Sequence, residues 1–136
     1  MEINFIFEEI KKFDFDKIIK SKIIEMCRLE KREIGYLNFI FCSDNYILKM
    51  NKKFLNHDFF TDVITFNYNE DKILNGDIFI SKDTVLYNSE KFNVPFENEL
   101  NRVMIHGVLH LIGYNEKNEI EKTEMKSKEN QYLNPS

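Results

Sequence analysis

The sequence is poor in the residues that mark secreted or low-complexity chains. Its 136 residues include 4 Gly, 2 Pro, 2 Cys and no Trp, and they contain no repeat, low-complexity segment or linker. Cys27 and Cys42 are not arranged as a C-x-x-C pair. Two such cysteines favour a reduced, cytoplasmic protein, with a single structural disulfide as the alternative.

Long apolar runs and excess positive charge are also absent. No apolar run reaches the roughly 18 residues that a membrane span needs, and the first residues, MEINFIFEEI, lack the basic segment of a signal peptide. The net charge of −4 argues against a generally basic nucleic-acid binder, so any RNA contact has to come from a local patch. The basic run at 17–32 is interpreted as a solvated helix face before a binding surface.

What remains is ordinary for one soluble domain, and we expect it to span residues 1–136. Hydrophobic residues make up 43% and charged residues 31%, and 13 Phe and 6 Tyr indicate an aromatic-rich core. Gly35 is expected to end the first helix. The apolar patterns predict strands at 3–7, 36–42, 62–68 and 77–80, and helices at about 14–32, 44–55, 81–92, 96–112 and 117–133. This order predicts an α+β fold, a small single domain with a mixed four-stranded sheet covered by helices.

The stretch HGVLHLIGYNE at 106–116 carries the chemistry. His106 and His110 are four residues apart in an apolar helical pattern, so their side chains project from one helix face about one turn apart. Two imidazoles so placed are able to bind one metal ion, as in zinc hydrolases. The alternative is a pair of histidines that only packs or forms hydrogen bonds.

The residues that follow favour the metal. Gly113 stands where a helix end needs a positive φ, so the chain is expected to turn back there and bring Glu116 towards the imidazoles. The pattern H-x-x-x-H-x-x-G-x-x-E matches the metzincin spacing with a carboxylate as third ligand. However, Gly107 occupies the position of the general-base Glu in a zinc protease, which argues against an ordinary metalloprotease.

Four stretches together resemble the YbeY family of metal-dependent endoribonucleases. HGVLHLIGY at 106–114 resembles the family signature H-G-x-L-H-L-x-G-Y-D-H. MNKKFLNHDFFTDVITF at 50–66, GDIFIS at 76–81 and FNVPFENELNRVMIHG at 92–107 resemble three further family segments. The resemblance covers about residues 37–133, and it implies a zinc-dependent endoribonuclease specific for single strands.

In the family the three motif histidines hold zinc. By resemblance His106 and His110 are two of the metal ligands, and the third motif histidine falls on Glu116. We expect Glu116 to replace it around one zinc ion, with another divalent transition metal as the alternative; otherwise Glu116 is only a solvent-exposed helix start. A family Arg that suits a phosphate contact falls on Leu55.

Five further residues are weaker site candidates. His57 is a candidate catalytic proton shuttle or phosphate-binding cation, or else a surface loop histidine. Lys52 and Lys53 are candidate RNA-phosphate contacts. Arg102, one turn before His106, is expected either to reach a phosphate or to pair with an acid. Asp62 is expected either to fix a ligand imidazole or to cap the turn before its strand.

The resemblance also implies a biological role. It predicts action on a ribosomal RNA precursor at the small ribosomal subunit, in 16S rRNA 3′-end processing and ribosome quality control, with no DNA or membrane partner. The general base is unassigned: His57 and a hydroxide at the metal are both candidates. The rivals are a non-catalytic ribosome assembly factor with a structural metal, and a zinc hydrolase of another substrate class, such as a peptidase.

Overall fold

Four strands form one mixed sheet in the computed structural model, which describes residues 1–55 and 62–134. The strand order is β1-β2-β4-β3, with β1, β2 and β4 parallel and β3 antiparallel to β4. The strands are Glu2–Phe7 (β1), Glu33–Cys42 (β2), Val63–Asn67 (β3) and Ile73–Ser81 (β4). The predicted mixed four-stranded sheet is therefore confirmed.

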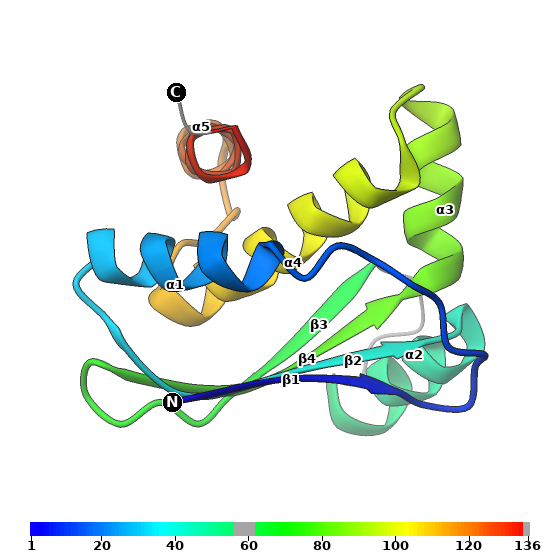
Figure 1. Cartoon of the computed structure of the whole chain (residues 1–136), viewed down its shortest axis with the longest axis horizontal. Helices are drawn as coiled ribbons and strands as arrows, with labels where there is room; N and C mark the ends of the chain where they lie inside the picture. The colour runs from blue at the N-terminus through cyan, green and yellow to red at the C-terminus, as the bar shows by residue number, and fades with distance from the viewer. Residues whose placement is uncertain (56–61, 135–136) are drawn as a thin grey trace.

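The helices lie on both faces of this sheet (Figure 1). They are Ile19–Leu29 (α1), Asp44–Met50 (α2), the π-helical turn Asn51–Leu55 (η1), Lys82–Lys91 (α3), Phe96–Ile112 (α4) and Glu119–Leu133 (α5). Helices α1 and α4 cover one face, and α5 lies over them on the side away from the sheet, while α2 lies under the opposite face. No helix in the described ranges has the length and apolar character that crossing a membrane requires.

Several predicted boundaries were wrong. Helix α1 begins at Ile19 and not at about 14, and β2 begins at Glu33 and not at 36. Helix α1 ends at Leu29, and Gly35 lies inside β2, at a register shift in its pairing with β4. Lys31 makes the turn instead, with a positive φ of 59°. Gly35 is needed for packing, because a Cβ there would lie 2.0 Å from Oδ1 of Asn75. Strand β4 is also longer than predicted, since it starts at Ile73 and pairs with the early part of β2.

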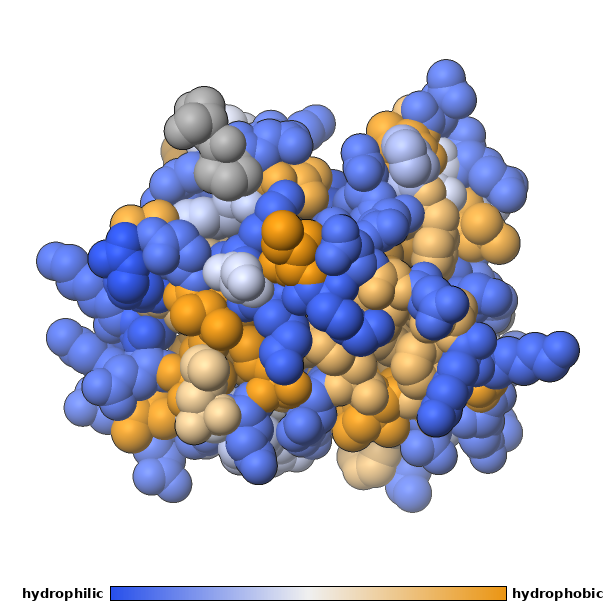
Figure 2. Space-filling model, in the orientation of Figure 1, coloured by the Kyte–Doolittle hydropathy of each residue, from blue (hydrophilic) through white to orange (hydrophobic). Residues whose placement is uncertain are grey.

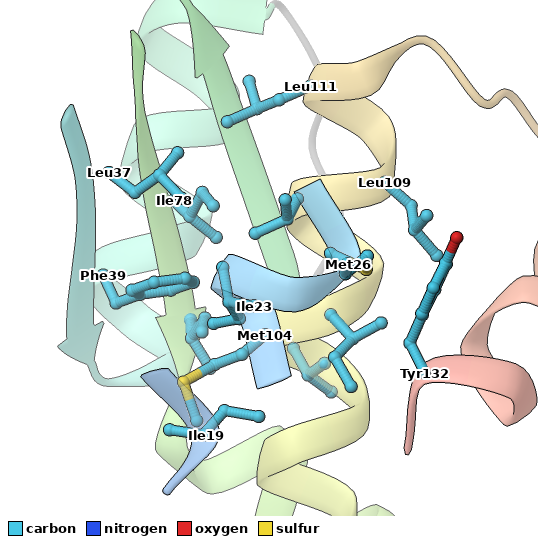
Figure 3. Close-up of a cluster of buried hydrophobic side chains, with 14 of the residues drawn as sticks. Ile19, Ile23, Met26, Leu37, Phe39, Ile78, Met104, Leu109, Leu111 and Tyr132 are labelled. Atoms are coloured by element: carbon cyan, nitrogen blue, oxygen red, sulfur yellow. The ribbon is translucent and has the colours of Figure 1, made fainter. Parts of the chain in front are cut away.

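The main core lies between the sheet and the layer of α1 and α4 (Figure 3). Apolar side chains from the sheet, α1, α4 and α5 meet there, among them Ile19, Ile23, Met26, Leu37, Phe39, Ile78, Met104, Leu109, Leu111 and Tyr132. Phenylalanine rings fill the part of the core next to β1, as the composition indicates: Phe5, Phe7, Phe13, Phe15, Phe39, Phe41 and Phe96 are in mutual ring contact. Cys27 and Cys42 are both buried and not disulfide-bonded, and burial raises the pKa of each thiol to about 12.

Two glycines let α4 press closely against the sheet. A Cβ on Gly107 would lie 2.7 Å from Cγ2 of Ile78, and a Cβ on Gly76 would lie 2.6 Å from Cδ1 of Leu111. Both separations are too short for ordinary packing. The residue after the first histidine therefore faces the sheet, and no side chain from position 107 reaches the outer surface of α4.

Candidate metal centre

Helix α4 reaches the surface along a single edge. From Glu99 to Ile112 every residue is buried except Arg102, His106 and His110, which recur every four residues. The hydrophobic pattern causes this, because apolar residues occupy all the buried positions of this stretch except Glu99 and Asn101. The helix therefore presents one cation and two imidazoles in a row.

The two imidazoles lie together at the end of this edge. Their ring centroids are 4.6 Å apart, and Nε2 of His106 lies 3.1 Å from Nε2 of His110. His106 is the more enclosed of the two, with 13% of its side chain exposed against 29% for His110. The predicted projection of both rings from one face is what the helix shows.

Glu116 approaches from the connection after α4. Gly113 ends the helix with φ of 127°, and its N–H and that of Tyr114 both donate to the carbonyl of Leu109. The expected positive φ at Gly113 is therefore confirmed, and the chain turns back there. Oε1 of Glu116 lies 3.0 Å from Nε2 of His106 and 3.1 Å from Nε2 of His110.

The three donor atoms fit a zinc ion. His106, His110 and Glu116 form a group whose ligand atoms all lie within 4.8 Å of one another, and the atoms named above stand 3.0 to 3.1 Å apart. Tetrahedral bonds of about 2.0–2.1 Å place two ligand atoms about 3.3 Å apart. A small outward shift of each side chain would accommodate the ion, and two nitrogens with one carboxylate are a donor set that zinc accepts.

Glu129 of α5 holds the first imidazole from behind. The Nδ1–H of His106 donates to Oε2 of Glu129 at 2.5 Å, and only 5% of Glu129 is exposed. This bond leaves the Nε2 lone pair of neutral His106 directed at the other two donors. A carboxylate behind a metal-binding imidazole fixes its tautomer and raises its basicity.

Arg102 connects Glu129 to two more acids. Its guanidinium donates to both carboxylate oxygens of Glu99, at 3.0 and 2.5 Å, and to Oε1 of Glu129 at 3.0 Å. The carboxylate of Asp62 lies 3.8 Å away. Of the two alternatives for Arg102, the structure thus shows pairing with acids.

The charges in this network shift the pKa values of its members. Burial lowers the pKa of His106, but the hydrogen bond to Glu129 and nearby carboxylates outweigh it, so the net shift is upward. Burial and the neighbouring charge of His106 lower the pKa of His110. Burial raises the pKa of Glu129, but His106 and Arg102 bring it below its usual range. The carboxylate form of Glu129, which His106 requires as acceptor, is therefore favoured.

A partly buried carboxylate anchors the elements around the site. Glu30, at the end of α1, accepts hydrogen bonds from the hydroxyls of Tyr114 and Tyr132 and from Nζ of Lys128. Burial raises its pKa, but these three donors together lower it below the usual value. The connection that carries Glu116 is thus tied to both α1 and α5.

Of the other candidates that the structure describes, neither lysine belongs to the group of His106, His110 and Glu116, and Asp62 acts on His106 through its charge. Lys52 and Lys53 are exposed on η1, which follows α2 on the opposite face of the sheet (Figure 1). The acceptor that fixes His106 is Glu129, whereas Asp62 lies beside Arg102. His57 lies outside the described residues.

Sequence reasoning missed Glu129 and Glu99. The sequence predicted a helix at about 117–133 without naming its buried face, and the buried positions of α5 are Met125, Glu129 and Tyr132. These residues follow the spacing of an apolar stripe, and an acid within such a stripe is the signal by which Glu129 could have been found. Glu99 lies three residues before Arg102, which is the spacing of a helical ion pair.

Comparisons with known proteins point to one family. The family model described as Endoribonuclease YbeY matches residues 3–136. A relative of that name from Karelsulcia muelleri is 56% identical over 104 residues, covering 76% of this chain and 74% of the relative. Another, from Bacteroides fragilis, is 46% identical over 125 residues, covering 92% and 87%. A solution structure from Thermotoga maritima has a TM-score of 0.69 at 32% identity, covering 98% of this chain and 87% of that one.

Proposed function

We propose that this chain, which belongs to the YbeY endoribonuclease family, is a zinc-dependent endoribonuclease that cleaves single-stranded RNA. Its proposed role is ribosomal RNA maturation in the cytoplasm, at the 3′ end of 16S rRNA on the small ribosomal subunit, together with ribosome quality control. The observation that carries the proposal is the convergence of His106, His110 and Glu116 at 3.0 to 3.1 Å.

The site has the openness that a catalytic centre needs. A catalytic zinc site uses three protein ligands and keeps one position for water or substrate. Glu116 and His110 have 38% and 29% of their side chains exposed, whereas His106 is held from behind by buried Glu129. The ligand set is thus fixed through His106 and accessible at His110 and Glu116.

The chemistry follows from the ligands and the substrate class. A bound zinc ion would supply a Lewis acid that activates the nucleophile and stabilises charge on the phosphate. Glu116 adds a negative charge where the family has a neutral histidine, so we expect a weaker Lewis acid. Arg102 keeps Glu129 ionised, and Glu129 keeps the Nε2 lone pair of His106 available. Position 107 cannot supply a general base, because Gly107 is packed against Ile78.

The proposal is tested by cleavage of an unstructured RNA with purified protein. His110→Ala serves as the site variant, and Asn98→Ala, at an exposed position about three turns earlier on α4, serves as its control. Metal content is measured on all three proteins. Cleavage by the wild type and N98A that tracks their zinc, with loss of both in H110A, is the expected result.

Three outcomes contradict the proposal. Equal cleavage by H110A would exclude this site. Zinc bound without cleavage of any RNA would make the metal structural and favour an assembly factor. Chelator-sensitive cleavage of casein would instead indicate a peptidase.

A further inference from the structure

A groove of about 500 Å³ adjoins the metal ligands and is not explained by them. His106, Glu116, Arg102, Glu99 and Glu129 form its floor. One wall comes from the α3–α4 connection, and α5 forms the other. In Figure 2 the outline of the molecule is notched between the tip where α3 meets α4 and the end of α5. A space of this size suits a small ligand or one unit of a polymer.

The wall between α3 and α4 offers an aromatic ring to solvent. Phe92 and Val94 line the groove and are 56% and 37% exposed. Nζ of Lys91 lies 5.6 Å from the Phe92 ring centroid, so a cation already accompanies the ring. Exposed aromatic rings beside positive charge are the platforms on which proteins stack bases of single strands.

The opposite wall carries positive charge. Lys122 and Lys126 line the groove from α5, on either side of the buried Met125. Lys122 has one exposed partner, Glu119, at 3.6 Å. Lys126 has no ion pair within the part of the chain that the structure describes. Amines so placed are suited to phosphate groups.

The metal decides the net charge of the groove. Three acids (Glu99, Glu116 and Glu129) and three bases (Arg102, Lys122 and Lys126) line it, so the charges of these side chains cancel. A divalent cation on the ligands makes the same surface doubly positive. Arg102 is already paired with two of these acids, Glu99 and Glu129. The α5 lysines are therefore the groove cations that remain to pair with a ligand.

From this arrangement we propose that the groove binds one nucleotide of single-stranded RNA next to the scissile phosphate. The base stacks on Phe92, and its flanking phosphate pairs with Lys126 and Lys122. This inference rests on the proposed function and adds a substrate subsite to it. A peptide is the less favoured occupant, because it has no phosphate to match the two amines.

Binding is measured separately from cleavage. The probe is a fluorescent single-stranded oligoribonucleotide with 2′-O-methyl riboses, titrated with the zinc-loaded protein by anisotropy at several salt concentrations. A gel after each titration confirms that the probe is intact. Phe92→Ala is compared with Tyr87→Ala, another exposed aromatic of this region, and Lys126→Ala with Lys20→Ala on α1.

F92A and K126A are expected to weaken RNA binding in different ways. F92A should weaken binding about tenfold with an unchanged salt dependence, because stacking on a ring is lost. K126A should weaken binding and reduce the slope of log affinity against log salt by about 0.7, as expected for one phosphate contact on a single strand. A probe with one abasic position should abolish the F92A effect when that position occupies the groove. Zinc content and circular dichroism should be unchanged in both variants.

The outcomes separate this inference from the proposed function. If F92A and K126A bind the probe as tightly as Y87A and K20A do, the groove is not a nucleotide-binding subsite, even if the wild type cleaves RNA. Displacement of the wild-type probe by an unphosphorylated acidic peptide, with no effect of K126A, would also overturn it. Normal probe binding with both variant effects, but no RNA cleavage, would support the groove and refute the nuclease.

Discussion

Glu129→Gln is expected to weaken zinc binding although residue 129 is not a ligand. The carboxylate accepts from His106 at 2.5 Å and from Arg102 at 3.0 Å, in a position that is 5% exposed. Glutamine has nearly the same volume, so packing is preserved while the charge is lost. Its single carbonyl cannot serve both donors, and its amide N–H group would face one of them.

The size of the effect follows from the role of this contact. Loss of the carboxylate behind a ligating histidine typically costs 10- to 100-fold in metal affinity, or roughly 1.4–2.8 kcal/mol. At saturating zinc, the zinc-dependent part of the unfolding free energy falls by the same amount. For a domain of this length, the zinc-dependent gain in Tm should shrink by roughly 5–10 °C.

The assay compares E129Q with Glu124→Gln, a matched change at an exposed position of α5. Zinc affinity is measured by competition with a chelating dye, and Tm is measured for each protein with and without zinc. A lower Tm of E129Q in both forms would report a lost structural contact only. The reasoning is refuted if E129Q and E124Q gain the same number of degrees from zinc.

Three further perturbations test neighbouring parts of the argument. Glu116→Ala should lower zinc affinity by about tenfold or more in the dye competition, because one of three metal ligands is lost. Unchanged zinc occupancy would mean that Glu116 is only an exposed residue at a helix start. Gly107→Glu should give no peptidase activity on casein and should cost several kcal/mol in urea unfolding, because the new carboxylate would be forced against the sheet; a stable, proteolytic variant would contradict this placement. Glu30→Gln should lower stability at neutral pH by about 1.5–3 kcal/mol for each charge-assisted hydrogen bond lost. Because the pKa of Glu30 is lowered on folding, its contribution is complete above the ordinary Glu pKa and disappears as pH falls through the lowered one; E30Q should therefore show a flatter decline of stability below about pH 4.5, and parallel acid curves would refute this.

The histidine pair could be predicted because its geometry is local. The helical spacing of four residues fixes the position of His106 relative to His110, and Gly113 fixes the turn that follows. The local sequence was therefore enough to predict that the three side chains converge. The third donor required only the short segment to Glu116.

The support of the site could not be predicted in the same way. Glu129 reaches His106 only because α5 folds back over α4, and the two residues are 23 positions apart. The prediction that Gly35 ends the first helix was wrong for a related reason. Its requirement comes from Asn75 on the neighbouring strand, and no pattern within residues 30–36 shows that contact.

The departure from the family histidine at position 116 is best understood from how that position is held. Gly113 reverses the chain, and the hydroxyl of Tyr114 binds Glu30, so the backbone near residue 116 is fixed without help from the side chain there. A side chain of similar reach then arrives at the same place whether it ends in an imidazole or a carboxylate. His106 is different, because it must donate through Nδ1 and present Nε2, and a carboxylate has no such pair of atoms. Replacement at 116 therefore changes the charge of the centre and leaves its geometry, whereas replacement at 106 would remove the link to Glu129.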